Sequence, residues 1–331
     1  GRTVRSGFYA SGTHKIIASK ECLVEDGRAR AILNDVAYLA GQFNIHAYQE
    51  DRGKGALRHG VVRCGYATDD VMLVLVVNGQ HLPHEQEFIA ALRKAHPELT
   101  SIFLNVNQKR TNAILGRETR LLWGSTSMSD KLLGCTFEIG PTSFYQTNPQ
   151  QTEVLYQLAI DGALADSEQT GDAQASNLRV LDAYCGTGTI GLVAAKGIDG
   201  KPGAKHLIGV EERIDAVADA RTNARHNGIG SAEFFADDAG AFMRRLAAEG
   251  GSVDAVFMDP PRAGATPDFL KAACLLAPRR IVYVSCNPAT QLRDARYLCD
   301  HGYRLDTLQP VDMFPHTEHV ETIAALSRKA D

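Results

Sequence analysis

The second half of the sequence alternates apolar segments with helix-like segments at a regular spacing, and this alternation constrains the fold most strongly. Repeated strand-helix units of this length predict a parallel sheet that is covered by helices on both faces. Ligands of such sheets bind at the carboxyl ends of the strands. The predicted strands are Arg179–Asp182, His206–Glu211, Ala232–Ala236, Asp254–Asp259 and Arg280–Ser285, and the helices between and after them end near Lys196, Asn227, Ala248, Leu276 and His301.

Residues 1–140 have a different pattern, with short strand-like segments around two helical stretches, Ala29–Gly41 and His84–His96. This pattern predicts a smaller α+β domain with an antiparallel sheet. A new helix is expected after Asn148, which can cap it, with Pro149 at the first helical position. We therefore expect two domains, 1–140 and 141–331, the second being an α/β domain with a Rossmann-like sheet.

Composition limits the class of protein without identifying it. The longest strongly apolar run, Val71–Val77, is far shorter than the roughly 20 residues that span a bilayer. Neither a secretory signal nor a C-x-x-C pair is present, so we expect a cytoplasmic protein with reduced thiols and no metal site. The net charge of −4 argues against a nucleic-acid-binding protein, although a basic stretch that includes Arg52, Lys54 and Arg58 could form a phosphate-binding face.

A glycine-rich turn follows the first strand of the alternating region, in Asp182-Ala183-Tyr184-Cys185-Gly186-Thr187-Gly188-Thr189. Glycines at this position let a ligand approach the backbone, and Glu211 at the end of the next strand can bind both hydroxyls of a ribose. The D-x-x-x-G-x-G order favours S-adenosylmethionine over a dinucleotide, since Asp182 can face an ammonium group. Asp238 is expected to meet the adenine amino group, with Asp237 as its rival.

Two further strands end in residues that can do chemistry. Asp259-Pro260-Pro261-Arg262 ends the fourth strand, and the prolines fix the backbone there. Arg262 replaces the aromatic residue that amino methyltransferases place after D/N-P-P. Cys286, in Ser285-Cys286-Asn287-Pro288, ends the fifth strand. At this point two interpretations of Cys286 remain, a buried structural cysteine and a reactive thiol.

Five segments in order resemble the motif set of the RNA uracil-5-methyltransferases: Gly140–Asn148, Asp182–Gly188, Asp259–Arg262, Ser285–Pro288 and Asp312–Glu321. The resemblance implies a class I methyltransferase domain that uses S-adenosylmethionine, preceded by a central domain that contacts RNA. Cys286 matches the family's nucleophile and Glu321 its base. The implied cofactor-binding residues are Gln146, Asp182, Tyr184, Gly186, Gly188, Thr189, Glu211, Asp238 and Asp259, and the implied substrate-binding residues are Phe144, Gln146, Asp259 and Arg262.

The expected function is transfer of a methyl group to carbon 5 of a uridine in RNA. We favour 23S ribosomal RNA as the substrate, with transfer RNA as the alternative, and we expect a monomer. An amino-group methyltransferase that uses the Asp-Pro-Pro motif, or a non-catalytic RNA-binding protein, would not need Cys286. Many relatives hold an iron-sulfur cluster with four cysteines; Cys22 resembles one of these ligands and cannot hold a cluster alone. From this resemblance we expect the chain to be a fragment that starts within the central domain.

Overall fold

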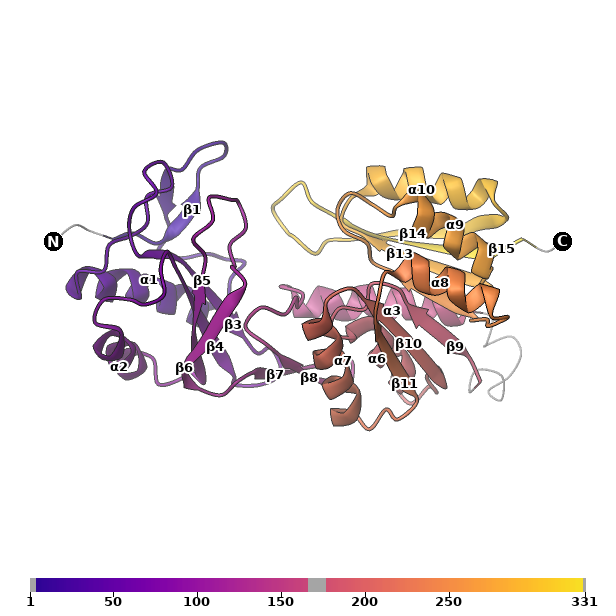
Figure 1. Cartoon of the computed structure of the whole chain (residues 1–331), viewed down its shortest axis with the longest axis horizontal. Coiled ribbons are helices and arrows are strands. Elements are labelled where there is room, and N and C mark those ends of the chain that lie inside the picture. The colour runs from indigo at the N-terminus through magenta and orange to yellow at the C-terminus, as the bar shows by residue number, and fades with distance from the viewer. Residues whose placement is uncertain (1–3, 166–176, 330–331) are drawn as a thin grey trace. The chain divides into compact units, whose positions relative to one another are not determined.

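The computed structural model describes residues 4–165 and 177–329, and these form two compact units (Figure 1). The first unit is Gly1–Asp130 with Ile139–Thr142, and the second is Lys131–Glu138 with Ser143–Asp331. Residues 131–138, which the sequence places in the first domain, therefore group with the second unit. The reason is that the backbone N–H groups of Thr136 and Glu138 donate hydrogen bonds of 2.8 Å to the side-chain oxygens of Asn227 and Asn223.

A four-stranded sheet with the order β3-β4-β5-β6 is the centre of the first unit. The β4–β5 pairing is parallel and the other two are antiparallel, so the sheet is mixed rather than antiparallel throughout as expected. The parallel pairing follows from helix α2, which connects β4 to β5 as a crossover. The elements are β1 (Gly7–Tyr9), β2 (Ile16–Ala18), α1 (Gly27–Gln42), β3 (Leu57–Cys64), β4 (Val71–Val77), α2 (Glu85–Ala95), β5 (Ser101–Val106) and β6 (Glu118–Gly124).

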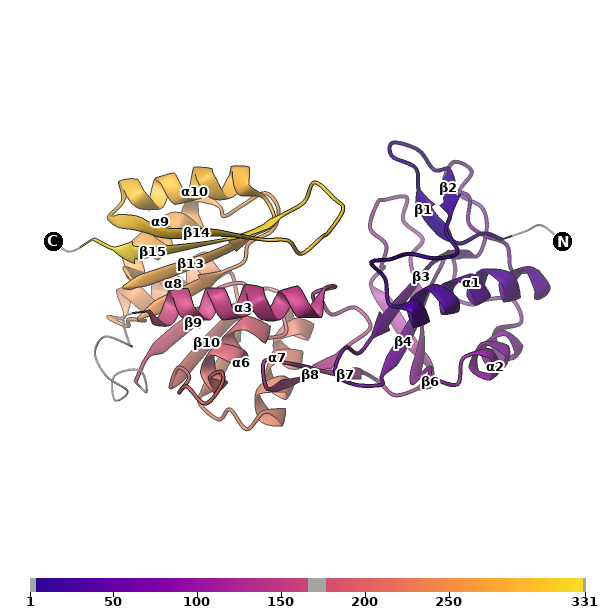
Figure 2. The ribbon, with the colours of Figure 1, turned by 180° about the vertical axis from the view of Figure 1, so that it is seen from behind.

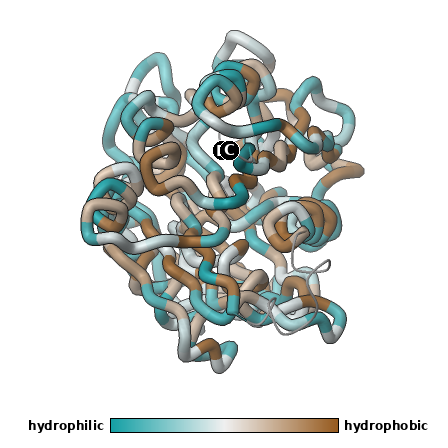
Figure 3. The backbone as a smooth tube through the Cα atoms, turned by 90° about the vertical axis from the view of Figure 1, so that its right-hand side faces the viewer, coloured by the Kyte–Doolittle hydropathy of each residue, from teal (hydrophilic) through white to brown (hydrophobic). Residues whose placement is uncertain are grey.

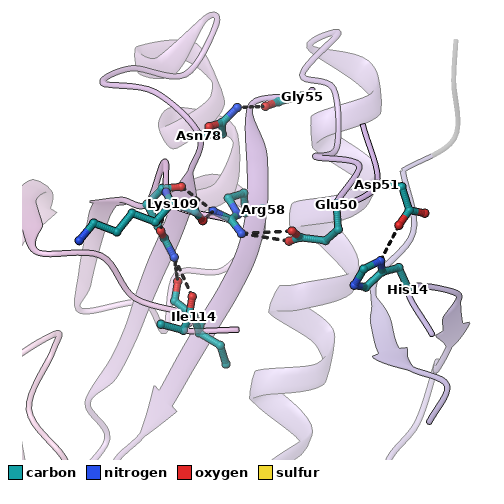
Figure 4. A network of polar contacts seen from close by, with 10 residues as sticks. His14, Glu50, Asp51, Gly55, Arg58, Asn78, Lys109 and Ile114 are labelled. Carbon is teal, nitrogen blue, oxygen red and sulfur yellow. Dashed lines mark hydrogen bonds and ion pairs between the residues drawn. The ribbon is translucent and has the colours of Figure 1, made fainter. Parts of the chain in front are cut away.

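A polar network in the first unit is centred on Arg58 of strand β3 (Figure 4). Its guanidinium donates to the backbone oxygens of Asn107 and Lys109 at 2.8 Å and forms an ion pair with Glu50 at 3.1 Å. The side chain is fully buried and also lies over the ring of Tyr48. Arg58 therefore joins the loop after β5 to the segment before β3.

The second unit is built on a seven-stranded sheet with the order β11-β10-β9-β12-β13-β15-β14. Strands β9 to β13 are parallel, and β15 and β14 add an antiparallel edge that the sequence analysis did not predict. The strands are β7 (Met128–Leu132), β8 (Cys135–Ile139), β9 (Arg179–Asp182), β10 (His206–Glu211), β11 (Ala232–Ala236), β12 (Ala255–Met258), β13 (Arg280–Ser285), β14 (Tyr303–Val311) and β15 (Glu321–Arg328), of which β7 and β8 pair separately.

Helices cover both faces of this sheet, with α3, α6 and α7 on one face and α8, α9 and α10 on the other (Figures 1 and 2). The helices are α3 (Pro149–Leu164), α6 (Thr189–Lys196), α7 (Ile214–His226), α8 (Ala239–Ala248), α9 (Pro267–Leu276) and α10 (Pro288–Asp300). Hydrophobic and hydrophilic stretches alternate along the backbone, as Figure 3 shows by colour. The strand residues Leu181, Val256 and Ile281 are fully buried and pack in one core cluster with Phe269 of α9.

The core accounts for the layered α/β arrangement, because helices on the two faces remove the apolar side chains of the central strands from water. Along the described parts of the chain, none of the helices combines the length and the apolar character that a bilayer crossing requires. The carboxyl ends of β9, β10, β12 and β13 lie at one edge of the sheet, and the residues expected at the site follow these ends.

Candidate active site

The glycine-rich turn joins β9 to α6 and has the backbone geometry that only glycine adopts without strain. Gly186 and Gly188 have φ angles of +53° and +86°, and Gly188 is the N-cap residue of α6. Asp182, at the end of β9, is buried and accepts a hydrogen bond from the backbone N–H of Gly191 in α6 at 3.0 Å. Asp182 thus holds the first turns of α6 against the strand that precedes the turn.

Glu211 lies beside this turn, at the end of β10. One carboxylate oxygen accepts from the backbone N–H of Gly186 at 3.3 Å, and the other accepts from the backbone N–H of Arg213 at 3.0 Å. The structure therefore brings Glu211 and the turn together, as a ribose site would require. Tyr184 packs against Phe269 with ring centroids 5.1 Å apart, and Thr189 lies 3.0 Å from the hydroxyl of Tyr156 in α3.

The two rival aspartates after β11 have different surroundings. Asp238 is exposed and caps α8, accepting from the backbone N–H of Ala241 at 2.6 Å. Asp237 forms an ion pair with Arg245 and accepts from the backbone N–H of Asp238 at 2.8 Å. Asp238 is the better candidate for a ligand contact, since the carboxylate of Asp237 is already committed to Arg245.

Cys286 and Glu321 are brought together by the pairing of β13 with β15. Ser285 pairs with Thr322 in antiparallel register, so Cys286 directly follows one member of the last pair and Glu321 directly precedes the other. The two side chains are close enough for the charge of Glu321 to raise the pKa of Cys286. The hydroxyl of Thr322 lies 3.2 Å from the backbone oxygen of Ser285 and 2.8 Å from Oε1 of Gln291. These contacts hold the two strand ends in register next to the expected nucleophile.

Three acidic side chains gather at this edge of the sheet. Burial, followed by the charges of Glu321 and Asp182, raises the pKa of Asp259 to about 8. Burial and, to a lesser degree, Glu211 raise the pKa of Asp182 to about 7, and burial raises the pKa of Glu321. Such a group of acids favours a cationic ligand, because a positive charge would offset both their burial and their mutual repulsion.

The thiol of Cys286 lies among the same charges. Burial, Glu321 and Asp259 raise its pKa, whereas Arg262 acts in the opposite direction. Arg262 is exposed, and its backbone oxygen accepts from the side-chain amide of Asn287 at 3.2 Å, so it is close in space to the residue after Cys286. Two influences on this thiol favour the thiolate: a hydrogen bond from its own backbone and, after it, the charge of Arg262.

The segment before α3 reaches the same region. Asn148 caps α3, as predicted, and donates from its side chain to the backbone oxygen of Met313 at 3.2 Å. This contact places the Gly140–Asn148 motif beside the Asp312–Glu321 motif. Gln146 is half-buried, and Phe144 is 71% exposed, so Phe144 is not a core aromatic residue and its ring can meet a ligand.

His316 and His319 are exposed, and His316 has a φ angle of +64°. Within residues 4–165 and 177–329, no group of three or more His, Cys, Asp or Glu side chains has a metal-binding arrangement.

The structure also adds residues that the sequence did not single out. Tyr156, Gln291 and Asp294 are buried polar residues at or near the strand ends, and each forms side-chain hydrogen bonds there. Their helical segments were predicted, and a polar residue on the apolar face of a helix was the signal that could have identified them.

Comparison with known proteins identifies the family of the chain. The family model described as tRNA (Uracil-5-)-methyltransferase matches residues 136–329. An uncharacterized RNA methyltransferase of Halalkalibacterium halodurans is 42% identical over 324 residues, which cover 98% of this chain and 68% of the relative. A second, from Staphylococcus aureus, is 42% identical over 323 residues with the same two coverages.

Solved structures give the same result. The crystal structure of Pyrococcus abyssi tRNA (uracil-54, C5)-methyltransferase in complex with S-adenosyl-L-homocysteine is similar with a TM-score of 0.74 and 29% identity, covering 94% of this chain and 70% of that chain. A putative S-adenosylmethionine-dependent methyltransferase from Streptococcus mutans shares the fold, with a TM-score of 0.54 and 12% identity. By its family match and its relatives, this chain belongs to the tRNA (uracil-5-)-methyltransferase family of RNA methyltransferases.

Proposed function

We propose that this chain transfers a methyl group from S-adenosylmethionine to carbon 5 of a uridine in RNA, through a covalent bond between Cys286 and carbon 6 of the uracil. The observation that supports the proposal is the register of β13 and β15, whose last pair, Ser285 with Thr322, is flanked by Cys286 and Glu321. Asp259 lies close enough to Glu321 for the charge of Glu321 to raise its pKa.

The proposed cofactor fits the residues of the second unit. S-adenosylmethionine carries a sulfonium and an ammonium group, and the acids Asp182, Asp259 and Glu321 favour a cation at this edge. Glu211 would bind the ribose, Asp238 the adenine, and the backbone of Gly186 and Gly188 would allow close approach. When bound, the cofactor supplies an electrophilic methyl group.

The residues of the chain would act in order around that transfer. The thiolate of Cys286 adds to carbon 6 of uracil, which moves electron density onto carbon 5 as an enolate, and carbon 5 is then methylated. Glu321 removes the proton from carbon 5; the bond from sulfur to carbon 6 breaks, and the carbon-carbon double bond re-forms. Burial raises the pKa of Glu321, which makes its carboxylate a stronger base for this step.

The remaining residues would hold the substrate. Asp259, which lies at the same edge of the sheet, would hold the polar edge of the uracil. Gln146 would lie between cofactor and base. Phe144 would stack on the extruded uridine or on its neighbour, since single RNA bases are commonly held by aromatic rings.

The experiment that tests the proposal compares Cys286→Ala with Glu321→Gln. Each protein is incubated with radiolabelled S-adenosylmethionine and unmodified RNA and is then run on a denaturing gel. Cys286→Ala should form no adduct and transfer no methyl group. Glu321→Gln should retain labelled RNA bonded to the protein, because the base that precedes elimination is missing, and the double variant should lose that band.

Cys274→Ala is the matched control, because this half-buried thiol is on α9, outside the proposed reaction. Normal turnover by Glu321→Gln, or methyl transfer by Cys286→Ala, would show that the covalent mechanism is wrong. The second outcome would instead favour an amino-group methyltransferase. Binding of both cofactor and RNA without any turnover would favour a non-catalytic role.

The RNA substrate is a separate proposal. We propose 23S ribosomal RNA first; transfer RNA is the second candidate, and the similarity to the Pyrococcus abyssi enzyme favours it. We also propose that the first unit contacts the RNA and that the enzyme acts as a monomer in the cytoplasm. Mapping 5-methyluridine in ribosomal and transfer RNA from cells with and without the gene distinguishes the two substrates.

A further inference from the structure

Helix α10 begins directly after Cys286, and its first two turns contact the loop that follows Asp259-Pro260-Pro261. The side-chain amide of Asn287 donates to the backbone oxygen of Arg262 at 3.2 Å, and the hydroxyl of Thr290 lies 3.5 Å from the same oxygen. Arg293 donates to the backbone oxygens of Ala263 and Ala265 at 3.2 Å each. The helix that starts at the proposed nucleophile thus binds the loop that carries Arg262.

Asp294 is the buried centre of these contacts. Its Oδ2 atom accepts from the backbone N–H of Ala265 at 2.8 Å and from the hydroxyl of Tyr283 at 2.9 Å, and its Oδ1 atom accepts from Arg293 at 2.7 Å. The side chain of Asp294 is fully buried. A fully buried carboxylate is costly unless it is hydrogen-bonded, and here three donors from three segments meet it.

Tyr283 extends the network to the strand that ends at the nucleophile, because it is in β13, three residues before Cys286. The loop is equally constrained at Gly264, where φ is +81° and an added Cβ would lie 2.6 Å from Arg293 and 2.7 Å from Asp294. A larger residue at Gly264 would displace the carboxylate. Strand β13, helix α10 and the loop therefore share one fixed contact, the carboxylate of Asp294.

We infer that Asp294 is a positioning residue that holds Arg262 and the loop after Asp259-Pro260-Pro261 at a fixed place relative to the thiol of Cys286. The inference rests on the proposed role of Cys286 as the nucleophile. Asp294 does not touch the reacting atoms; it acts through the loop and through Tyr283. Displacing reacting groups by about 1 Å can lower a rate by about 100-fold, so the carboxylate is expected to matter for chemistry more than for cofactor binding.

The test compares Asp294→Ala with Asp294→Asn. Asp294→Ala removes all three acceptor contacts and should lower kcat for methyl transfer by about 10- to 100-fold, while the affinity for S-adenosylmethionine changes by less than about twofold. Asp294→Asn keeps one oxygen, which can still accept from Ala265 and Tyr283, so it should recover most of the lost rate. A second readout without RNA is the rate at which iodoacetamide alkylates Cys286 as a function of pH. In Asp294→Ala, the alkylation profile should move to higher pH, because Arg262 is no longer held near the thiol.

Leu298→Ala is the control for general destabilisation. Leu298 is fully buried on the same helix, and its truncation lowers stability while the hydrogen-bonding groups around Asp294 are all retained. It should leave the alkylation profile unchanged. If Asp294→Ala fails to fold, Tyr283→Phe, which removes only one donor, should show a smaller shift in the same direction.

Wild-type turnover and an unshifted alkylation profile in Asp294→Ala would overturn the inference. So would an equal shift in Leu298→Ala, because the effect would then be general loss of stability. If Glu321→Gln, with Asp294 intact, accumulates no adduct through Cys286, the proposed function itself is wrong. Failure of the proposed function can be distinguished from failure of the inference, because the adduct experiment uses protein in which Asp294 is unchanged.

Discussion

Asp259 combines burial with two acidic neighbours, and this combination makes the stability of the unliganded protein depend on pH. An acid whose pKa is raised on folding binds its proton more tightly in the folded state than in the unfolded state. Its contribution to stability is therefore full below the unfolded pKa of about 4 and is lost as the pH rises through the folded pKa. For Asp259 the folded pKa is about 8, so the loss falls between about pH 4 and pH 8.

Asp259→Asn should remove this titration. We expect the variant to be more stable than the wild type at pH 9, by on the order of a few kcal/mol, with a difference that shrinks toward pH 5. The effect should be smaller than the full pKa shift implies, because the side chain keeps part of its surface exposed. Urea unfolding without cofactor at pH 5, 7 and 9 measures it. Asp300→Asn, on the exposed end of α10, is the control. A difference that is constant across this range would contradict the prediction.

Glu211 carries the second residue-scale prediction. Glu211→Ala should weaken binding of S-adenosylmethionine by about 1 to 3 kcal/mol, because the ribose hydroxyls lose a charged acceptor. The same change frees the backbone N–H of Gly186, which Glu211 accepts at 3.3 Å. Titration calorimetry measures the affinity, and Glu212→Ala, which removes the adjacent exposed carboxylate, is the matched control. Equal affinities for the two variants would mean that the ribose lies elsewhere.

At the scale of elements, most of the second unit could be predicted because its local signals agree with its tertiary packing. Asn148 with Pro149 predicted the start of α3, and the structure confirms it; Thr266 with Pro267 and Asn287 with Pro288 form the same kind of helix start. Strand β15 contains a buried apolar run, residues 323–326, which was not recognised as a strand, whereas β14 was missed for a physical reason. Strand β14 is exposed along most of its length and contains Pro310, so it shows neither an apolar run nor alternation.

Strand β4 carried a sequence signal for parallel pairing, although its domain was predicted to have an antiparallel sheet. Val71–Val77 is apolar at every position and buried at every position, which is typical of a strand covered on both faces and common in parallel pairing. Candidate site residues such as Asp182, Glu211, Asp259 and Cys286 could be proposed because they end or follow strands. Phe144, Gln146 and Glu321 were proposed from the family resemblance. Partners such as Tyr156 and Asp294 could not be predicted, since their roles depend on contacts with segments distant in the chain.

The pairing of β13 with β15 gives an element-scale prediction at Thr322. Thr322→Val keeps the side-chain shape but removes the hydroxyl that contacts Gln291 at 2.8 Å, leaving a buried amide oxygen without that partner. We expect the free energy of unfolding to fall by about 1 to 3 kcal/mol. Urea denaturation measures the change, with Thr307→Val on the exposed edge strand β14 as the control. Equal losses of unfolding free energy in both variants would indicate that strand propensity, and not this contact, causes the destabilisation.

At the scale of the whole molecule, charge is the property that bears most on RNA binding. The chain has a net charge of −4, and among the arginines of the first unit two with buried side chains are paired with acids. Arg58 forms its ion pair with Glu50 and has a fully buried side chain, and Arg30 pairs with Glu25 and is 6% exposed. Arg58, which the sequence analysis grouped with a basic face, is therefore not available to phosphate.

We therefore expect RNA binding by this chain to depend weakly on salt. Each phosphate neutralised on single-stranded RNA contributes about −0.7 to the slope of log K against log salt concentration, so fewer than about four contacts predict a slope shallower than about −3. Filter binding between 50 and 200 mM salt, as rough limits, measures the slope. A slope steeper than about −5 would show that a basic surface has been overlooked.

Two variants separate a phosphate contact from a structural ion pair. Arg52→Ala removes an exposed charge and should make the slope less steep by about 0.7 if Arg52 meets phosphate. Arg58→Gln should leave the slope unchanged and should lower the free energy of unfolding by about 2 to 4 kcal/mol, because Glu50 loses its partner in a largely buried position. A shallower slope in Arg58→Gln with unchanged stability would reverse the assignment, making Arg58 a phosphate ligand and the polar network of Figure 4 incidental.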